Sequence, residues 1–486
     1  ENKECENDEG GYFIIKGKER VLISQLRNVY NIPLVHAQKP GTKYKYICET
    51  RSMSEETGHS VLIQVNLSVD ERVLTFTLPY IKEQIHVGVV FKALGYKNEE
   101  IMQLIGLNCE KAEKYLKLIV NDSFFVEENS GFELFSDDLK EEFSDKFIDD
   151  TKSNISLLES LWDQLTIEEK EEYKQKASTR KALRYIGTFS KNPQKENEKH
   201  IYAEQVVQNE IFPHLGITSS NKEKAMLLGH MVHKLLATTI GIRQADDRDN
   251  YINKRVDSPG MLCHELFRQL YKKYMSTITI QLEKKKQFPD IMSLIPRMTD
   301  ITKGFIQCFS KGNWGVPKAS YVKPGVAQIL SRLSYGATLS NLRRVGIPKA
   351  KESKNAAIRQ INPSQIMFIC PVETPEGQPV GIVLNLSLLT RISNRIPTVL
   401  IKETIEMCEN IVNIEEHDIS KELTKVFING NLIGMTEDSF ELLEELREFR
   451  MIEMIPWDVS ISFDDIDDEI HICSDDGRLL RPVFCI

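Results

Sequence analysis

The order of hydrophobic patterns along the chain limits its fold more than any other feature. Apolar and β-branched residues alternate, as in half-buried strands, in residues 11–27, 43–49, 60–67 and 73–80. Helical spacing follows, most clearly in residues 225–240, where one apolar side is formed by positions 227, 228, 231, 235 and 236. Strand patterns return in residues 398–486. The sequence therefore predicts an α+β fold.

Turn signals divide these patterns into hairpins. Lys16-Gly17 separates two apolar runs, and Asn429-Gly430 suits a two-residue type I′ turn. Asp476-Gly477 is a similar turn signal near residue 486. A chain of 486 residues is too long for one core of ordinary size, so three or four domains are expected.

Several classes of protein are excluded or disfavoured by simple counts. The sequence has no run of eighteen apolar residues, which excludes a membrane-spanning helix and predicts no membrane partner. None of the nine cysteines forms a CxxC pair, so a zinc ribbon is not expected and the thiols are interpreted as reduced. The chain opens on the acidic residues 1–10 without a signal-peptide pattern, and we expect it to be part of a longer protein.

Positive charge is concentrated in residues 303–359. This basic segment has eleven Lys and Arg and one acid, Glu352, in a chain of net charge −9. Such an island predicts a local polyanion contact, and the alternative is a solvated, loop-rich face.

The basic segment has two loops around a spacer. Residues 311–325 form the first loop, residues 326–344 are predicted to be helical, and residues 345–355 form the second loop. Arg359 and Gln360 are placed at the start of a strand. Lysines suit phosphate neutralisation and arginines suit bidentate contacts. The candidate nucleic-acid-binding residues are Lys318, Lys323, Arg332, Arg343, Arg344, Lys349, Lys351, Lys354, Arg359 and Gln360.

The aromatic residues of the first loop have two interpretations. Trp314 and Tyr321 could stack on unpaired bases. The alternative is packing in the core, which is favoured for Trp314.

A proline-rich segment follows the basic one. Pro371, Pro375 and Pro379 impose a rigid, non-helical path from which Glu373 and Glu376 project. A general acid/base pair, and hence a hydrolase, is one hypothesis. No histidine or metal cluster lies nearby in the sequence, so acids braced against neighbouring arginines are favoured as support for an active centre.

Two other polar clusters could bind a metal. Asp246, Asp247 and Asp249 could hold a divalent cation, but the alternating charges of residues 243–255 favour ion pairs among themselves. His230 and His233 share a helix face without a third ligand, which favours ordinary packing. No metal or cofactor is predicted for this chain.

The run CPVETPEGQPVGIVLNLS resembles a signature of the second-largest, β-like subunit of multisubunit DNA-directed RNA polymerases. Other segments resemble that family in the same order, in the eukaryotic or large-DNA-virus form. They are GGYFIIKGKERVLI, LPYIKEQIHVGVVFKALG, DDRDNYINKRVD, KGNWG, GVAQILSRLSYGATLSNLRR, FINGNLIG and DGRLLRPVF.

The resemblance implies a multidomain architecture. It would place the end of the first protrusion segment in residues 1–28, the lobe in 29–250, the returning protrusion segment in 251–310, the fork in 311–397 and the first external region in 398–486. Fork loops would lie in the two basic loops and contact DNA and RNA. Residues Arg359, Gln360 and Glu376 would then lie near the active centre.

The resemblance also implies partners. These are the largest subunit and other polymerase subunits, the DNA template, the RNA–DNA hybrid, and initiation or elongation factors on the lobe and protrusion. The catalytic Mg²⁺ would be held mainly by the largest subunit, so this chain alone is expected to be inactive. The protein would act in the nucleus or cytoplasm, or in a viral factory or virion. The rival interpretation is a stand-alone nucleic-acid-binding scaffold without a polymerase role.

Overall fold

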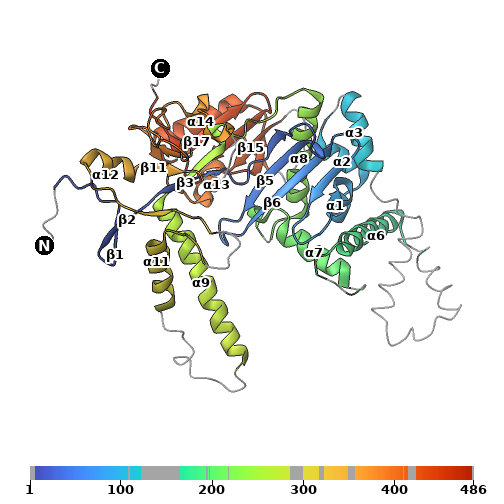
Figure 1. Cartoon of the computed structure of the whole chain (residues 1–486). Helices are drawn as coiled ribbons and strands as arrows, with labels where there is room; N and C mark the ends of the chain where they lie inside the picture. Colours follow the sequence, from blue (N-terminus) through green and yellow to red (C-terminus); the bar gives the residue numbers. More distant parts are fainter. Residues whose placement is uncertain are drawn as a thin grey trace. The chain divides into compact units, whose positions relative to one another are not determined.

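The protein folds into two compact units, each assembled from separated stretches of the chain (Figure 1). Figure 1 shows a computed structural model. It describes residues 6–107, 110–121, 162, 165–192, 195, 198–216, 218–284, 299–316, 322–348, 356–408, 410–413 and 423–483. Unit 1 comprises residues 1–29, 249–397 and 474–486, and unit 2 comprises residues 30–248 and 398–473. Helices and sheets are mixed throughout, which confirms the predicted α+β class.

Unit 2 begins with an antiparallel five-stranded sheet of order β4-β5-β6-β7-β8. Its strands are β4 (Leu34–Ala37), β5 (Tyr44–Met53), β6 (Ser60–Ser68), β7 (Leu74–Thr77) and β8 (Ile85–His86). In β6 the side chains of Val61, Ile63 and Val65 are buried in alternation, as the period of a half-buried strand requires. This face forms one core with the helices that follow in the chain.

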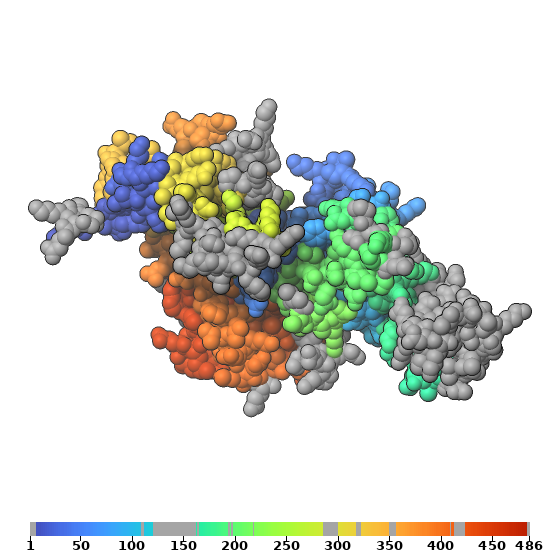
Figure 2. All heavy atoms as spheres, turned by 90° about the horizontal axis from the view of Figure 1, so that it is seen from below, coloured from blue at the N-terminus to red at the C-terminus, as the bar shows by residue number. Residues whose placement is uncertain are grey.

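The helices that follow this sheet in the chain pack against it directly or through one another. They are α1 (Val87–Ala93), α2 (Asn98–Ile105), α3 (Glu110–Asn121), α6 (Ile167–Thr188), α7 (Lys199–Glu210), the 3₁₀ turn η2 (Pro213–Leu215) and α8 (Asn221–Ile240). Helix α8 begins with a capping box between Ser220 and Glu223, and it packs against β5 and β6. All five apolar positions predicted for it are buried, which confirms the predicted helix. In Figure 2 the green atoms of these helices lie against the blue atoms of the sheet stretch.

A buried histidine makes unit 2 sensitive to acid. Burial lowers the pKa of His214 to about 3, and its Nδ1 lies 2.6 Å from the Ser52 hydroxyl. The usual pKa is 6.5, so unfolding takes up a proton below that pH. The free energy of unfolding should then fall by up to ~1.4 kcal/mol per pH unit between pH 6.5 and the folded pKa.

We expect His214→Gln to flatten this pH dependence in urea unfolding measured at several pH values. The partly exposed His59 supplies the control, and His59→Gln should leave the acid slope of the parent protein in place. An unchanged slope in His214→Gln would contradict the assignment.

The second sheet of unit 2 has the order β14-β16-β15-β18-β17. Its strands are β14 (Val412–Asn413), β15 (Thr424–Ile428), β16 (Asn431–Thr436), β17 (Ser460–Asp464) and β18 (Glu469–Cys473), accompanied by α13 (Thr398–Ile405) and α14 (Ser439–Met451). Asn429 and Gly430 both have positive φ, which confirms the predicted hairpin turn. A Cβ at Gly430 would lie 2.3 Å from the Asn31 carbonyl oxygen, so a side chain is excluded there.

The described residues of unit 1 form three small sheets. Their orders are β1-β2-β10, β12-β11-β3-β9 and β13-β19. The strands are β1 (Phe13–Ile15), β2 (Lys18–Leu22), β3 (Ser24–Asn28), β9 (Lys254–Asp257), β10 (Ala327–Ile329), β11 (Arg344–Gly346), β12 (Val383–Asn385), β13 (Arg391–Ile392) and β19 (Leu479–Leu480). The hairpin predicted at Lys16-Gly17 is confirmed by β1 and β2.

The helices of unit 1 include a projecting antiparallel pair. These two are α9 (Pro259–Lys284) and α11 (Thr299–Lys311), which lie side by side in Figure 1. The others are α12 (Tyr335–Leu342) and the 3₁₀ turns η3 (Tyr251–Asn253), η5 (Ala357–Arg359) and η6 (Pro363–Gln365). Among the described residues, no helix is both long and apolar enough to cross a membrane.

Two local predictions for the basic segment were wrong. Residues 326–344 were predicted to form one helix or two, but β10 pairs with β2 at their start and only α12 is helical. Arg344 belongs to a strand, β11, and the residues before Gln360 form the 3₁₀ turn η5 instead of a strand. In the first case the pairing partner is about 300 residues away, which local periodicity cannot register.

Candidate nucleic-acid interface

The candidate interface is built on β10, α12, β11 and the proline-rich loop of unit 1. Four of the predicted binding residues, Lys318, Lys349, Lys351 and Lys354, lie outside the described residues, as does Tyr321. The other predicted residues have definite surroundings.

Lys323 is held inside the unit. Its backbone pairs with that of Trp314, and its Nζ lies 3.1 Å from Asp257 and 3.2 Å from Glu265. Burial alone would lower the pKa of Lys323, but the two carboxylates outweigh it and raise that pKa. The charge of Lys323 is therefore compensated within the chain.

Arg332 is neutralised in a similar way, although it is more exposed. Its guanidinium is 2.9 Å from Glu19 and 3.1 Å from Asp8, and it lies over the Tyr12 ring. The hydrogen bond from Arg332 lowers the pKa of Glu19 below its usual value.

Two further arginines support loops. Arg343 ends α12 and donates from Nη2 to the Ser387 carbonyl at 2.6 Å. Arg359 donates from Nη1 to the carbonyls of Gln378 at 2.5 Å and Val380 at 2.9 Å. Both guanidinium groups hold the main chain in place while keeping their positive charge.

Arg344 differs from these residues. It is half-buried on β11, opposite Asn385, and its Nε is buried without a hydrogen-bond partner. Within the described part of the chain its guanidinium makes no hydrogen bond or ion pair. A buried donor without a partner costs free energy, so Arg344 is, among the described candidate arginines, the one best suited to an external acceptor.

The proline-rich loop presents Glu376 to solvent. The Gly381 amide donates to the Thr374 hydroxyl, which donates to the Val383 carbonyl at 3.0 Å. Gly381 has φ +71°, and a Cβ there would lie 2.5 Å from the Arg359 carbonyl oxygen, so Arg359 and the loop are in tight contact. Glu376 is exposed at the tip of this braced loop.

The acid/base hypothesis for this loop gains no support. Glu373 accepts a hydrogen bond from Ser340, which engages one of the two carboxylates. No group of three or more potential metal ligands occurs among the described residues.

Trp314 is a core residue, as the packing alternative predicted. It is 3% exposed, its Nε1 donates to the Leu262 carbonyl at 2.7 Å, and it packs edge-on against Phe309. It therefore has no free face for a base.

The acidic cluster near residue 246 forms ion pairs, as the charge alternation predicted. Asp246 lies 2.9 Å from Arg243 and accepts from the Val35 amide at 2.7 Å. Lys254 lies 3.8 Å from Asp249. His230 packs against the ring of Phe427, with the ring centroids 5.1 Å apart, and Nδ1 of His233 lies 2.8 Å from the Ile105 carbonyl.

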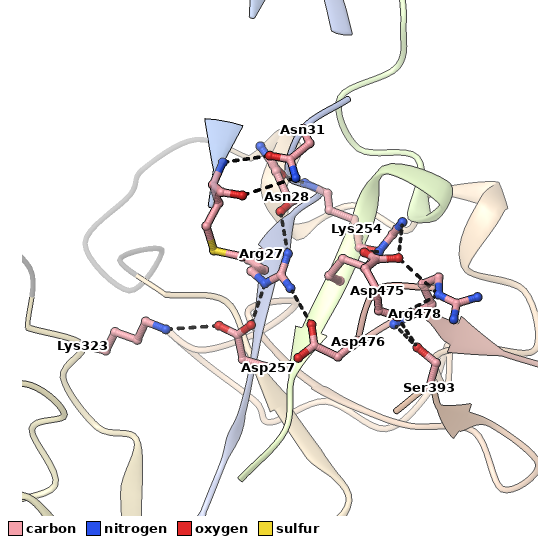
Figure 3. A network of polar contacts seen from close by, with 12 residues as sticks. Arg27, Asn28, Asn31, Lys254, Asp257, Lys323, Ser393, Asp475, Asp476 and Arg478 are labelled. Atoms are coloured by element: carbon pink, nitrogen blue, oxygen red, sulfur yellow. Dashed lines mark hydrogen bonds and ion pairs between the residues drawn. The ribbon is translucent and has the colours of Figure 1, made fainter. Parts of the chain in front are cut away.

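A network of ion pairs that was not predicted from the sequence fixes the base of the interface. Figure 3 shows Arg27 between Asp257 and Asp476, with Lys323 on the other side of Asp257. Arg255 is paired with Asp475 at 2.6 Å. Arg27 and Arg255 are each more than 200 residues from their acidic partners in the sequence, so no local pattern could have indicated these pairs.

Comparison with known proteins identifies the class of protein. The family models of three RNA polymerase Rpb2 domains match this chain in order. Domain 2 matches residues 30–129 and 144–257, domain 3 matches 328–392 and domain 4 matches 426–486. The chain belongs to the Rpb2 family, the second-largest subunits of DNA-directed RNA polymerase. The resemblance predicted from the motifs is thus confirmed.

Particular relatives come from viruses and eukaryotes. A probable DNA-directed RNA polymerase II subunit RPB2 homolog of Invertebrate iridescent virus 6 is 37% identical, over 98% of this chain and 39% of that protein. The RNA polymerase II subunit RPB2 of Encephalitozoon cuniculi is 31% identical, over 99% of this chain and 39% of that protein. The chain thus spans about two fifths of the length of these relatives.

Proposed function

We propose that this chain is a portion of a polymerase second subunit that shapes the DNA cleft and contacts nucleic acid without holding the catalytic metal. The observation that carries the proposal is the ordered match of three Rpb2 domains along one chain. Transcription, as DNA-directed RNA synthesis, is the activity in which it would take part.

The domain assignment remains part of the proposal. Residues 1–28 and 251–310 would belong to the protrusion, 29–250 to the lobe, 311–397 to the fork and 398–486 to the first external region. The fork would face the DNA template and the RNA–DNA hybrid, and the largest subunit would supply most ligands of the catalytic Mg²⁺. Transcription factors would bind the lobe and protrusion, in the nucleus or in a viral factory.

Within the fork, Arg344 is proposed as the main phosphate contact among the described residues. The support is its buried Nε without a partner, in contrast to Arg332, whose charge Glu19 and Asp8 compensate. Lys349, Lys351 and Lys354 would add further phosphate contacts nearby in the sequence.

The test is DNA binding by polymerase assembled with the full-length second subunit. We expect Arg344→Ala to weaken binding to a bubble DNA and to reduce the slope of log K against log salt by about one. Arg332→Ala removes the same formal charge and serves as the matched control, for which little change is expected. Equal effects of the two substitutions would contradict the assignment of Arg344.

A further inference from the structure

A group of large apolar side chains is exposed where α14 ends in unit 2. Met451 is 82% exposed, Ile452 64%, Met454 47% and Trp457 65%. They fall within seven residues and form what we call the α14 turn surface. Contiguous exposed apolar side chains are uncommon outside binding sites, and Trp and Met are enriched in protein interfaces.

The turn that carries these side chains is firmly held. The Ile455 amide donates to the Phe449 carbonyl at 3.1 Å, and Arg450 donates from Nη1 to the Val459 carbonyl at 3.2 Å. The side chains of Ile455 and Val459 are buried, so they anchor the turn while their neighbours project outward.

One backbone angle shows that this conformation is strongly imposed. Glu453 has φ +62°, in the left-handed region that residues other than glycine rarely adopt. A preorganised surface of this kind loses little conformational entropy when a partner binds.

The surroundings of the α14 turn surface are acidic. Residues 437–458, which include α14 and the turn, contain eight Asp and Glu and two arginines. Glu448 and Glu453 are exposed beside the apolar side chains, and Asp458 is partly exposed. Of the two arginines, Arg450 is committed to the Val459 carbonyl. Such a rim repels nucleic acids and anionic membranes and attracts cations.

We propose that the α14 turn surface binds a helix of a partner protein that has apolar side chains on one face and flanking lysines and arginines. The apolar face would cover Trp457 and the two methionines, and the basic flanks would meet Glu448, Glu453 and Asp458. This binding does not depend on the proposed nucleic-acid contacts, which involve unit 1.

The test uses the 486-residue chain and two synthetic helical peptides. One contains only leucine and lysine, in amphipathic order, and the other replaces each lysine by glutamate. We expect the basic peptide to bind, with affinity that falls as salt rises, and the acidic peptide to bind at least tenfold more weakly. Fluorescence anisotropy of labelled peptides gives the affinities.

Substitutions locate the site. Trp457→Ala should weaken binding of the basic peptide at least tenfold, as expected for a central interface tryptophan. Glu453→Lys should also weaken it and reduce the salt dependence. Ile167→Ala removes another exposed apolar side chain of unit 2, distant from α14 in the sequence, and should change nothing. Circular dichroism would confirm that the variants are folded.

Three results would overturn the proposal. They are equal binding of the two peptides, binding that survives Trp457→Ala in folded protein, and self-association of the chain that Trp457→Ala abolishes. The last result would assign the surface to a second copy of this chain.

Discussion

Replacing Glu469 by alanine is expected to lower the free energy of unfolding of unit 2 by ~3–5 kcal/mol. Glu469 is 1% exposed on β18, and its Oε2 lies 2.9 Å from Nζ of Lys234, which is itself buried on α8. Removing the carboxylate leaves the lysine buried with Asp467 at 3.3 Å as its remaining acidic partner. Hydrogen exchange of α8 and β18 in rising urea would measure the loss.

An exposed pair in the same unit provides the control. Glu113 and Lys117 lie 2.7 Å apart at i,i+4 on α3, and both are more than half exposed. Glu113→Ala should cost far less than Glu469→Ala, because water and ions screen the exposed pair. Similar losses in Glu469→Ala and Glu113→Ala would mean that the buried cluster does not stabilise unit 2.

The sign of the pH effect follows from the same cluster. Burial would raise the pKa of Glu469, but His230 and Lys234 outweigh burial and hold it well below the usual 4.5. A carboxyl with a lowered folded pKa contributes stability above the unfolded pKa and loses it as pH falls toward the folded value. Glu469→Ala should therefore be most damaging near neutral pH and least damaging in strong acid.

Replacing Asp257 by alanine is expected to destabilise unit 1 by ~3 kcal/mol or more. Asp257 is 2% exposed and lies 2.6 Å from Arg27 and 3.1 Å from Lys323 (Figure 3). Both cations are largely buried, so the substitution leaves two positive charges with less compensation. Urea unfolding followed by hydrogen exchange in β3 and β9 is the appropriate measurement.

A substitution of Glu265, the second acid beside Lys323, distinguishes the effect of burial from the effect of losing one negative charge. Glu265 lies 3.2 Å from the same Nζ but is 41% exposed. Glu265→Ala should cost less than ~1 kcal/mol, because solvent can replace its contact. A loss as large as that of Asp257→Ala would show that net charge, and not burial, controls the effect.

The fold could be predicted where local physics decides it. The hairpin turns at Lys16-Gly17 and Asn429-Gly430 need only positive φ at two residues. The helix α8 is indicated by the helical spacing of its apolar residues. The strand β10 could not be predicted in this way, because its three residues become a strand through pairing with β2.

The position of the candidate site could be predicted from the excess of positive charge in residues 303–359, but the residues that are free to bind could not. Counting charges treats Lys323, Arg332 and Arg344 as equivalent. Asp257 and Glu19, which compensate the first two, are distant in the sequence. The folded structure shows that Arg344 has no compensating acid within the described residues. This difference singles out Arg344 from the basic segment as the proposed phosphate contact.

The interleaved stretches of the two units have a consequence for synthesis on the ribosome. Strand β13 pairs with β19, and Arg255 pairs with Asp475, so unit 1 needs residues after 473 to complete its contacts. Until residues 474–486 are synthesised, residues 1–29 and 249–397 of unit 1 therefore have unpaired strand edges and uncompensated charges. Nascent chains of this protein should therefore depend on chaperones until that last stretch is available.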